Sequence, residues 1–304
     1  MRLVIALGGN ALLRRTERPD ARIQASHVRE AVSSLAPLLD AHEVLVAHGN
    51  GPQVGLLAVE SAEDPQLAEP YPLDVLGAET QGMIGYWLVR ELRHARPRRE
   101  VAGLLTEIVV DADDPAFDRP TKFVGRGYGE RDAAGLRDER GWTLCPDGSA
   151  WRRVVPSPEP RDVPELPTLR RLLGDGCVVV AAGGGGTPVV MTPDGPSGVE
   201  AVVDKDLTAA LLAERLDADA LLMLTDVSAV MRGFGTPRAA PVRRATPAEL
   251  RALDLPAGSM APKAEAACRF AEHRPGAFAA IGALSDAVAL VDGRAGTRVQ
   301  AKFD

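Results

Sequence analysis

The sequence predicts an α/β protein in which helices cover both faces of a mainly parallel β-sheet. Strand-like apolar runs alternate with stretches of helical periodicity along most of the 304 residues, and such alternation implies right-handed crossovers between parallel strands. Aromatic residues make up only 4% of the chain, which favours a core of small aliphatic side chains between helices and sheet. The length suits one large domain or two lobes.

The predicted elements follow one another as strand, glycine-rich turn and helix. Short apolar runs predict strands at 3–7, 43–47, 101–110, 177–182, 220–224 and 277–281. Apolar positions at helical spacing predict helices at 21–41, 73–94, 204–216 and 261–272. In sheets of this kind ligands bind at the carboxyl ends of the strands, and the glycine clusters of this chain fall there.

Residues 113–167 interrupt this alternation, because Pro and Gly divide them into short pieces. A structureless loop of this length would be unusual in a compact domain. We therefore predict an inserted, protruding subdomain, formed by a few hairpins that project over the ligand site. The chain as a whole is predicted to be one domain over 1–304, with an N-terminal lobe over about 1–195 and a C-terminal lobe over about 196–304.

The bulk properties exclude several classes of partner. A net charge of −7 and a pI near 5.4 argue against a general nucleic-acid binder. No stretch approaches a membrane span, and the chain begins with a strand where a signal peptide would stand. The cysteines Cys145, Cys177 and Cys268 are far apart, which indicates free thiols in a reducing compartment. We expect a cytoplasmic protein that binds neither nucleic acid nor membrane.

Lysine is rare in this chain. Of the 35 Lys and Arg side chains, only Lys122, Lys205, Lys263 and Lys302 are lysine. A compact ammonium group and a planar guanidinium group are not interchangeable, so the retained lysines indicate sites that need the former. Codon bias explains the scarcity but not the positions. We interpret Lys302, near the C-terminus, as a surface charge.

Two of these lysines stand where a predicted helix begins. The helix macrodipole disfavours a cation at this end, so Lys205 and Lys263 indicate an anion bound nearby. Asp204 suits the N-cap and Asp206 the first turn. Asp206 could orient the lysines without binding a metal. The sequence before Lys263 lacks the second Gly of a P-loop, and Lys263 is not followed by Ser or Thr, which excludes a P-loop NTPase.

Two glycine turns contain the only asparagines of the chain, Gly8-Gly9-Asn10 and Gly49-Asn50-Gly51. Glycine N–H groups and helix N-termini bind anions. Each turn alone also fits a tight strand–helix connection, but together they predict a shared polar pocket. We interpret His48 as a hydrogen-bonded loop residue rather than a catalytic base.

The run Gly183–Gly186 does not match a dinucleotide-binding fingerprint, because Pro188 stands where Gly or Ala is required. Two interpretations remain for this run. It fits either a backbone that an anion can approach or a flexible crossover between lobes.

Taken in order, the motifs resemble those of the carbamate kinases in the amino-acid-kinase superfamily. The matching pieces include A-L-G-G-N-A from Ala6, H-G-N-G-P-Q-V-G from His48, T-Q-G-M-I-G-Y-W from Thr80, P-T-K from Pro120, G-V-E-A-V-V-D-K-D from Gly198 and G-S-M-A-P-K from Gly258. The resemblance implies a three-layer αβα open sandwich with a sheet of about eight strands, a protruding subdomain and a homodimer. It also implies reversible phosphoryl transfer between ATP and carbamate, giving ADP and carbamoyl phosphate, often used for ATP synthesis. Mg²⁺ would accompany ATP or ADP, held mainly by the nucleotide phosphates and not by protein ligands.

The resemblance also implies roles for single residues. Lys205 and Lys263 would contact the phosphoryl oxygens, Asp206 would hold both ammonium groups, and Lys122 would reach down from the protruding subdomain. The backbone would cradle the phosphoryl group and carbamate at Gly8, Gly9, Asn10, Gly49, Asn50 and Gly51. The N-terminal lobe would bind the substrate and the C-terminal lobe the nucleotide, near Thr225, Asp226, Met260 and Lys263.

This chain departs from the family pattern at two places, and two other functions also fit the motifs. Ser228 replaces a usual Asp, and residues 123–128 read Phe-Val-Gly-Arg-Gly-Tyr where a Pro-Ile-Gly-Pro type sequence is common. One alternative is a related kinase for another small acid, such as an acylglutamate. The other is a non-catalytic nucleotide-binding homologue, which would be expected to lose the lysines.

Overall fold

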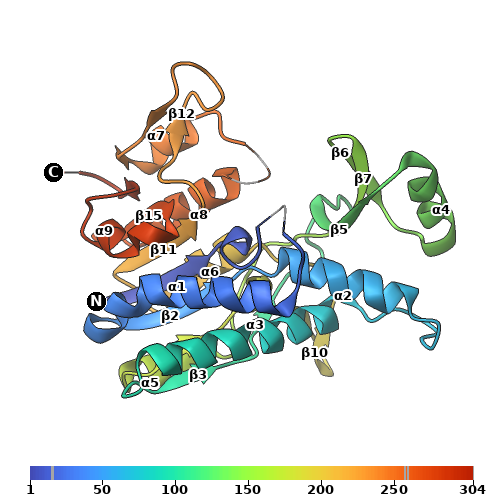
Figure 1. Ribbon diagram of the computed structural model, residues 1–304, viewed down its shortest axis with the longest axis horizontal. Helices are drawn as coiled ribbons and strands as arrows, with labels where there is room; N and C mark the ends of the chain where they lie inside the picture. Colours follow the sequence, from blue (N-terminus) through green and yellow to red (C-terminus); the bar gives the residue numbers. More distant parts are fainter. Residues whose placement is uncertain (15–16, 257, 259, 304) are drawn as a thin grey trace.

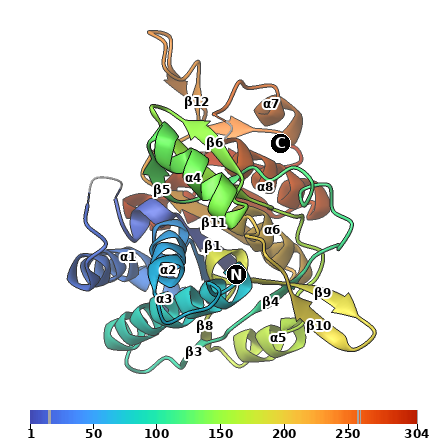
Figure 2. The ribbon, with the colours of Figure 1, turned by 90° about the vertical axis from the view of Figure 1, so that its right-hand side faces the viewer.

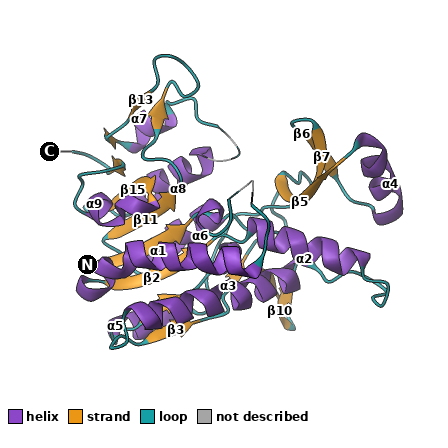
Figure 3. Ribbon diagram, viewed as in Figure 1, coloured by secondary structure: helices purple, strands orange, loops and turns teal. Residues whose placement is uncertain are grey.

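The computed structural model describes residues 1–14, 17–256, 258 and 260–303, and for Asn10 only the backbone. A mainly parallel sheet of eight strands forms its centre (Figures 1 and 3). Its strands, in spatial order, are β14 (Arg244–Ala245), β16 (Thr297–Val299), β15 (Phe278–Ala283), β11 (Ala220–Thr225), β1 (Arg2–Leu7), β2 (Glu43–His48), β8 (Val178–Val180) and β3 (Val101–Gly103). The pair β15–β16 is antiparallel and the other neighbours are parallel.

Helices cover both faces of this sheet, which confirms the predicted three-layer α/β fold. One face packs against α1 (Ala21–Ala41), α3 (Leu73–Ala95) and the short α9 (Ala287–Val291). The other face packs against α5 (Leu166–Gly174), α6 (Lys205–Arg215) and α8 (Met260–His273), and α7 (Pro247–Arg251) lies on α8. The central strands are apolar on both faces because both are buried; Leu3 and Val4, for example, are each 0% exposed.

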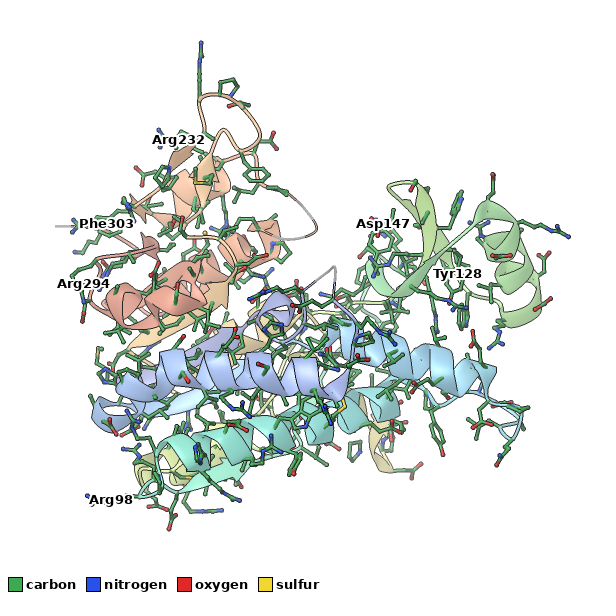
Figure 4. All side chains as sticks on the ribbon, viewed as in Figure 1. Arg98, Tyr128, Asp147, Arg232, Arg294 and Phe303 are labelled. Atoms are coloured by element: carbon green, nitrogen blue, oxygen red, sulfur yellow. The ribbon has the colours of Figure 1, made fainter. Side chains whose placement is uncertain are left out.

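A small unit projects from one end of the molecule (Figures 1 and 2). It consists of the antiparallel strands β5 (Lys122–Tyr128), β7 (Ala150–Val155) and β6 (Leu144–Asp147), with α4 (Glu130–Arg140) beside them. Tyr128 and Asp147 mark this unit in Figure 4. It falls within the segment for which the sequence predicts a protruding subdomain, and α2 (Gly51–Glu63) lies at its base.

The predicted strand at 101–110 is wrong in one respect, because the structure has two separate strands there. After β3 it leaves the central sheet, and β4 (Glu107–Val109) joins β9 (Thr187–Thr192) and β10 (Gly195–Gly198) in a separate sheet. Gln81 fixes the break: its side chain accepts from the N–H of Thr106 at 3.0 Å and donates to the Thr106 carbonyl at 3.1 Å. A side chain from α3 thus takes the place of a neighbouring strand.

The remaining elements are short. The strands β12 (Met231–Arg232) and β13 (Ala240–Pro241) form a two-stranded hairpin. Three 3-10 turns lie at Gly9–Ala11, Gly183–Gly185 and Leu284–Asp286. In the part of the chain that the structure describes, none of the helices combines the length and the apolar character that crossing a membrane requires.

Candidate active site

A cavity of about 360 Å³ lies where the carboxyl ends of three central strands meet. Gly8 and Gly9 follow β1, Gly49 follows β2, and Thr225 ends β11; all four residues line the cavity. Because these strands are parallel neighbours, their carboxyl ends share one edge of the sheet. Lys122, the first residue of β5, lines the cavity from the protruding unit. The cavity thus lies between the sheet and that unit.

Three helices begin at this cavity. The first residue of each helix, Gly51 of α2, Lys205 of α6 and Met260 of α8, is among the lining residues. Helix N-termini present unpaired N–H groups and a partial positive charge. Their convergence gives the cavity a positive potential of the kind that suits an anion.

The two glycine turns of the sequence touch one another at the floor of the cavity. The N–H of Gly8 donates to Leu224 O at 2.9 Å, and that of Gly49 to Leu7 O at 3.0 Å, so each turn is tied to a strand. A Cβ on Gly49 would lie 3.0 Å from the backbone nitrogen of Gly9. Glycine is therefore needed for the close approach. Residues of both turns line one cavity, so the predicted shared pocket is present.

Asn50 is fixed by a residue that the sequence-based predictions did not include. Its side-chain N–H group donates to Thr80 Oγ1 at 2.8 Å, and Thr80 in turn donates to Gly77 O at 2.7 Å. Thr80 is 0% exposed and belongs to α3. Its position in the T-Q-G motif was the signal that could have identified it. The side chain of Asn10 lies outside the described part of the structure.

The run Gly183–Gly186 packs tightly against the site. A Cβ on Gly184 would lie 2.2 Å from Asn50 Nδ2, and one on Gly185 would lie 2.4 Å from Val203 O. Gly184, Gly185 and Gly186 also have positive φ angles of 68°, 99° and 87°, which favour glycine. The interpretation as a flexible crossover does not fit this packing. Gly184 lines the cavity, so the run supports the shape of the site.

Asp206 holds two of the lysines. Its Oδ1 lies 2.5 Å from Lys205 Nζ and its Oδ2 lies 2.9 Å from Lys263 Nζ. Because Lys263 comes from α8, the carboxylate joins the starts of two helices. Lys205, Asp206 and Lys263 all line the cavity, and Asp206 is only 3% exposed.

Asp204 holds the third lysine. Its Oδ2 accepts from Lys122 Nζ at 2.6 Å, while its Oδ1 accepts from the N–H of Asp206 at 2.9 Å. The second contact confirms the predicted N-cap of α6. The ion pair with Lys122 was not predicted, because cap geometry alone already explained an Asp at this position. Three ammonium groups and two carboxylates give this cluster a net charge of +1, which suits a polyanion.

Burial and charge act against one another in the cluster. Burial alone would raise the pKa of the Asp206 carboxyl group, but the ammonium groups of Lys205 and Lys263 outweigh it and hold the pKa below its usual range. Burial lowers the pKa of Lys205, and the nearby charge of Lys263 adds to this, while Asp206 opposes both. Asp206 therefore limits the fall in the pKa of Lys205 that burial and Lys263 cause.

His48 is hydrogen-bonded, as predicted, but it is the last residue of β2 and does not lie in a loop. It is 1% exposed, and its Nδ1 lies 3.0 Å from Gly49 O, so this nitrogen carries the proton. Burial lowers its pKa to about 4. His48 supports the glycine turn and is not placed to take part in proton transfer in the cavity.

The comparisons with known proteins agree with the fold. The amino acid kinase family matches residues 1–277. The carbamate kinase of Rhizobium meliloti (strain 1021) is 48% identical over 308 residues, which cover 100% of this chain and 94% of that protein. The carbamate kinase of Haemophilus influenzae is 47% identical over 306 residues, 100% of this chain and 98% of that protein.

A solved structure gives the same result. The carbamate kinase from Giardia lamblia bound to AMP-PNP superposes with a TM-score of 0.91 at 35% identity, and 98% of each chain is covered. This chain therefore belongs to the amino acid kinase family and, within it, to the carbamate kinases. The predicted family is confirmed.

Proposed function

We propose that this chain catalyses reversible phosphoryl transfer between ATP and carbamate, giving ADP and carbamoyl phosphate. One observation carries the proposal: Lys205, Lys263 and Lys122 converge on one cavity whose floor is built from glycine turns and helix N-termini. Phosphoryl transfer requires this combination, because catalysis consists mainly of positioning the reactants and neutralising charge on the phosphoryl oxygens. The full-length similarity to carbamate kinases supports carbamate as the acceptor.

The reaction needs no nucleophilic side chain. A carbamate oxygen attacks the γ-phosphorus of ATP, a new O–P bond forms, and the bond to the bridging oxygen breaks, leaving its electron pair on ADP. We place the transferred group over Gly8, Gly9, Asn10, Gly49, Asn50 and Gly51, whose backbone lies at the ends of β1 and β2. Lys205 lies beside this floor, since its Cε would be 3.5 Å from a Cβ on Gly49. Its ammonium group would neutralise the transferred phosphoryl group.

The nucleotide would occupy the part of the cavity formed by the C-terminal half of the chain. Thr225, Asp226 and Met260 line it there, together with Lys263. We assign Lys263 to the β-phosphate, because it stands at the start of α8 beside Met260. The AMP-PNP bound to the Giardia lamblia enzyme supports a nucleoside triphosphate as the ligand of this fold.

Mg²⁺ would enter with the nucleotide phosphates. Among the described residues, no three His, Cys, Asp or Glu side chains gather closely enough to hold a metal ion. Of the three carboxylates that line the cavity, Asp204 and Asp206 bind lysines. This donor set suits a metal ion that is held by the phosphates, where it reduces their negative charge and favours attack by another anion. The protein supplies the lysines around that complex.

We also propose a homodimer in the cytoplasm. The dimer follows from the resemblance to carbamate kinases. The cytoplasmic location is supported by Cys145, Cys177 and Cys268, which are all unpaired.

The proposed activity is tested by measuring ATP formation from ADP and carbamoyl phosphate, with acetylglutamyl phosphate as a parallel phosphoryl donor. We expect ATP from carbamoyl phosphate and none from the acylglutamate derivative. Turnover with the second donor alone would contradict carbamate as the acceptor and identify a related kinase for another small acid.

A further inference from the structure

The protruding unit rests on a small junction. Val124 of β5 and Val155 of β7 are 3% and 2% exposed, and they pack on Val54 and other apolar residues of α2 and α3. Beside them the backbones of α2 and β5 touch, since a Cβ on Gly55 would lie 2.8 Å from the nitrogen of Gly125. The apolar contact is small, so polar contacts must help to fix where the unit lies.

Three such contacts fall on the segment that leads into α6. Arg153 Nη2 donates to Glu200 Oε1 at 2.7 Å. The N–H of Val202 donates to Pro156 O at 3.0 Å, and Lys122 Nζ donates to Asp204 at 2.6 Å. These contacts come from residues 200, 202 and 204. The segment 200–204 therefore binds both β5 and β7, and the end of β7 at Pro156.

The Arg153–Glu200 pair is better fixed than another ion pair across the junction. Glu200 Oε2 also accepts from the N–H of Leu73, the first residue of α3, at 2.7 Å. The Arg153 guanidinium group lies 4.5 Å from the ring centre of Trp142, and Arg153 and Glu200 are 16% and 48% exposed. The other pair, Arg126 with Glu63, is 60% and 59% exposed. Exposed ion pairs are weakened by solvent, so the Arg153 pair contributes more to the position of the unit.

We propose that Arg153 and Glu200 are positioning residues that set the reach of Lys122 into the cavity. This inference rests on the proposed function, in which Lys122 contacts the transferred phosphoryl group. Strand pairing places Lys122 opposite Val155, two residues from Arg153, so a shift of β7 at Arg153 moves Lys122. When a polyanion binds, Lys122 must share or leave the carboxylate of Asp204. Arg153 and Glu200 hold the strand pair in place while the ammonium group changes its partner.

A double-mutant cycle tests the inference through kcat/KM for ATP formation from ADP and carbamoyl phosphate. Alone, Arg153→Gln should lower kcat/KM by about tenfold, mainly through kcat. In a Lys122→Ala background the same substitution should change it less than about twofold, because its effect passes through Lys122. Equal losses in both backgrounds would overturn the inference, as would full activity of Arg153→Gln.

Arg126→Gln is the matched control, because it removes the same charge from the same unit and also breaks an ion pair across the junction. It should leave kcat/KM unchanged. If Arg153→Gln does not fold, Glu200→Gln takes its place, since the amide oxygen can still accept from Leu73. Full activity of Lys122→Ala, or an inactive wild type, would contradict the proposed function and not the geometry of the junction.

A second measurement is independent of activity. Hydrogen exchange of the Val202 N–H reports on the junction, because its bond to Pro156 crosses it. Arg153→Gln should speed this exchange by about tenfold, and Arg126→Gln should not. Unchanged exchange in Arg153→Gln would overturn the positioning role even if catalysis were lost.

Discussion

Asp206 and Lys263 join the starts of α6 and α8, with Asp206 Oδ2 2.9 Å from Lys263 Nζ, while the other carboxylate oxygen binds Lys205 at 2.5 Å. This one carboxylate contacts both lysines, and it is buried. Removing it would leave two ammonium groups close together without the carboxylate that joins them, although Asp204 still lies near Lys205.

We therefore expect Asp206→Asn to lose both activity and stability. Breaking a buried ion pair by removing one partner costs about 3–5 kcal/mol, and the two lysines would repel one another. Urea denaturation gives the loss of stability, and ATP formation gives the loss of activity. Asp217→Asn is the control, because Asp217 forms an exposed pair with Arg274 and should change the free energy of unfolding by less than about 0.5 kcal/mol. Equal stability of the two variants would contradict the bridging role of Asp206.

Lys205→Ala should slow phosphoryl transfer at least a hundredfold. Removing a group that neutralises developing charge typically costs about 3 kcal/mol in the barrier. Lys205→Arg keeps the charge, but we expect it to retain less than about a tenth of the activity, because a planar guanidinium group does not fit against the glycine floor. Steady-state kinetics of both variants check this. Lys302→Ala is the control, because it removes an exposed lysine and should turn over at the wild-type rate. A wild-type rate in Lys205→Ala would exclude a role of Lys205 in neutralising the phosphoryl group.

Stability should fall as the pH drops from about 6.5 to about 4 because of His48. Burial lowers its pKa from the ordinary 6.5 to about 4 in the folded protein. The unfolded chain therefore binds the proton first, and the folded state loses about 3 kcal/mol over this range. Urea denaturation at pH 7 and pH 4.5 should show a smaller fall in His48→Gln than in the wild type. An equal fall in both proteins would show that His48 is not the group responsible.

A different pH range reports on the cavity carboxylates. The pKa values of Asp204 and Asp206 lie below their usual range; burial opposes this shift, and the neighbouring lysines cause it. Their stabilisation is present above the unfolded pKa of about 4 and is lost as the pH falls through the lower folded values. Below pH 4 the free energy of unfolding of the wild type should therefore fall further. In Asp206→Asn this fall should be smaller, because the variant lacks one of the two carboxylates.

Gly184→Ala should disturb the site through Asn50. The new Cβ would lie 2.2 Å from Asn50 Nδ2, at a backbone φ of 68°. We expect a loss of about 1–3 kcal/mol in the free energy of unfolding and a lower kcat, because Asn50 must move. Gly135→Ala is the control: Gly135 lies inside α4 with no atom within 4 Å of its Cβ position, so it should gain about 0.5–1 kcal/mol. Thermal unfolding and kinetics compare the two variants.

The sequence was sufficient to predict the fold class because the strands are short, apolar and separated by helical periodicity. It also located Lys205 and Lys263, since a lysine at a helix start in a lysine-poor chain is unusual. It could not predict the break at Thr106, which depends on a side chain 25 residues away in sequence. Local apolar alternation is the same whether such a chain continues in one sheet or crosses into another.

The contacts of Lys122 could not be predicted from the sequence for a similar reason. Its partner Asp204 lies 82 residues away, and the cap of α6 already accounted for that carboxylate. The position of the protruding unit depends on Gly55 and Gly125 meeting backbone to backbone, and a glycine in a sequence does not reveal what approaches it. Long-range pairings of this kind follow only from the assembled fold.

The distribution of primary amines has a practical consequence for immobilisation. Three of the four lysine side chains line the cavity, which leaves Lys302 and the exposed amino terminus at Met1 as the other amines. Both chain ends lie on the side of the molecule opposite the protruding unit (Figure 1). A bound nucleotide would protect the cavity lysines during coupling to an amine-reactive sensor chip. The protein would then be attached through Met1 or Lys302, and the cavity would stay accessible to solution.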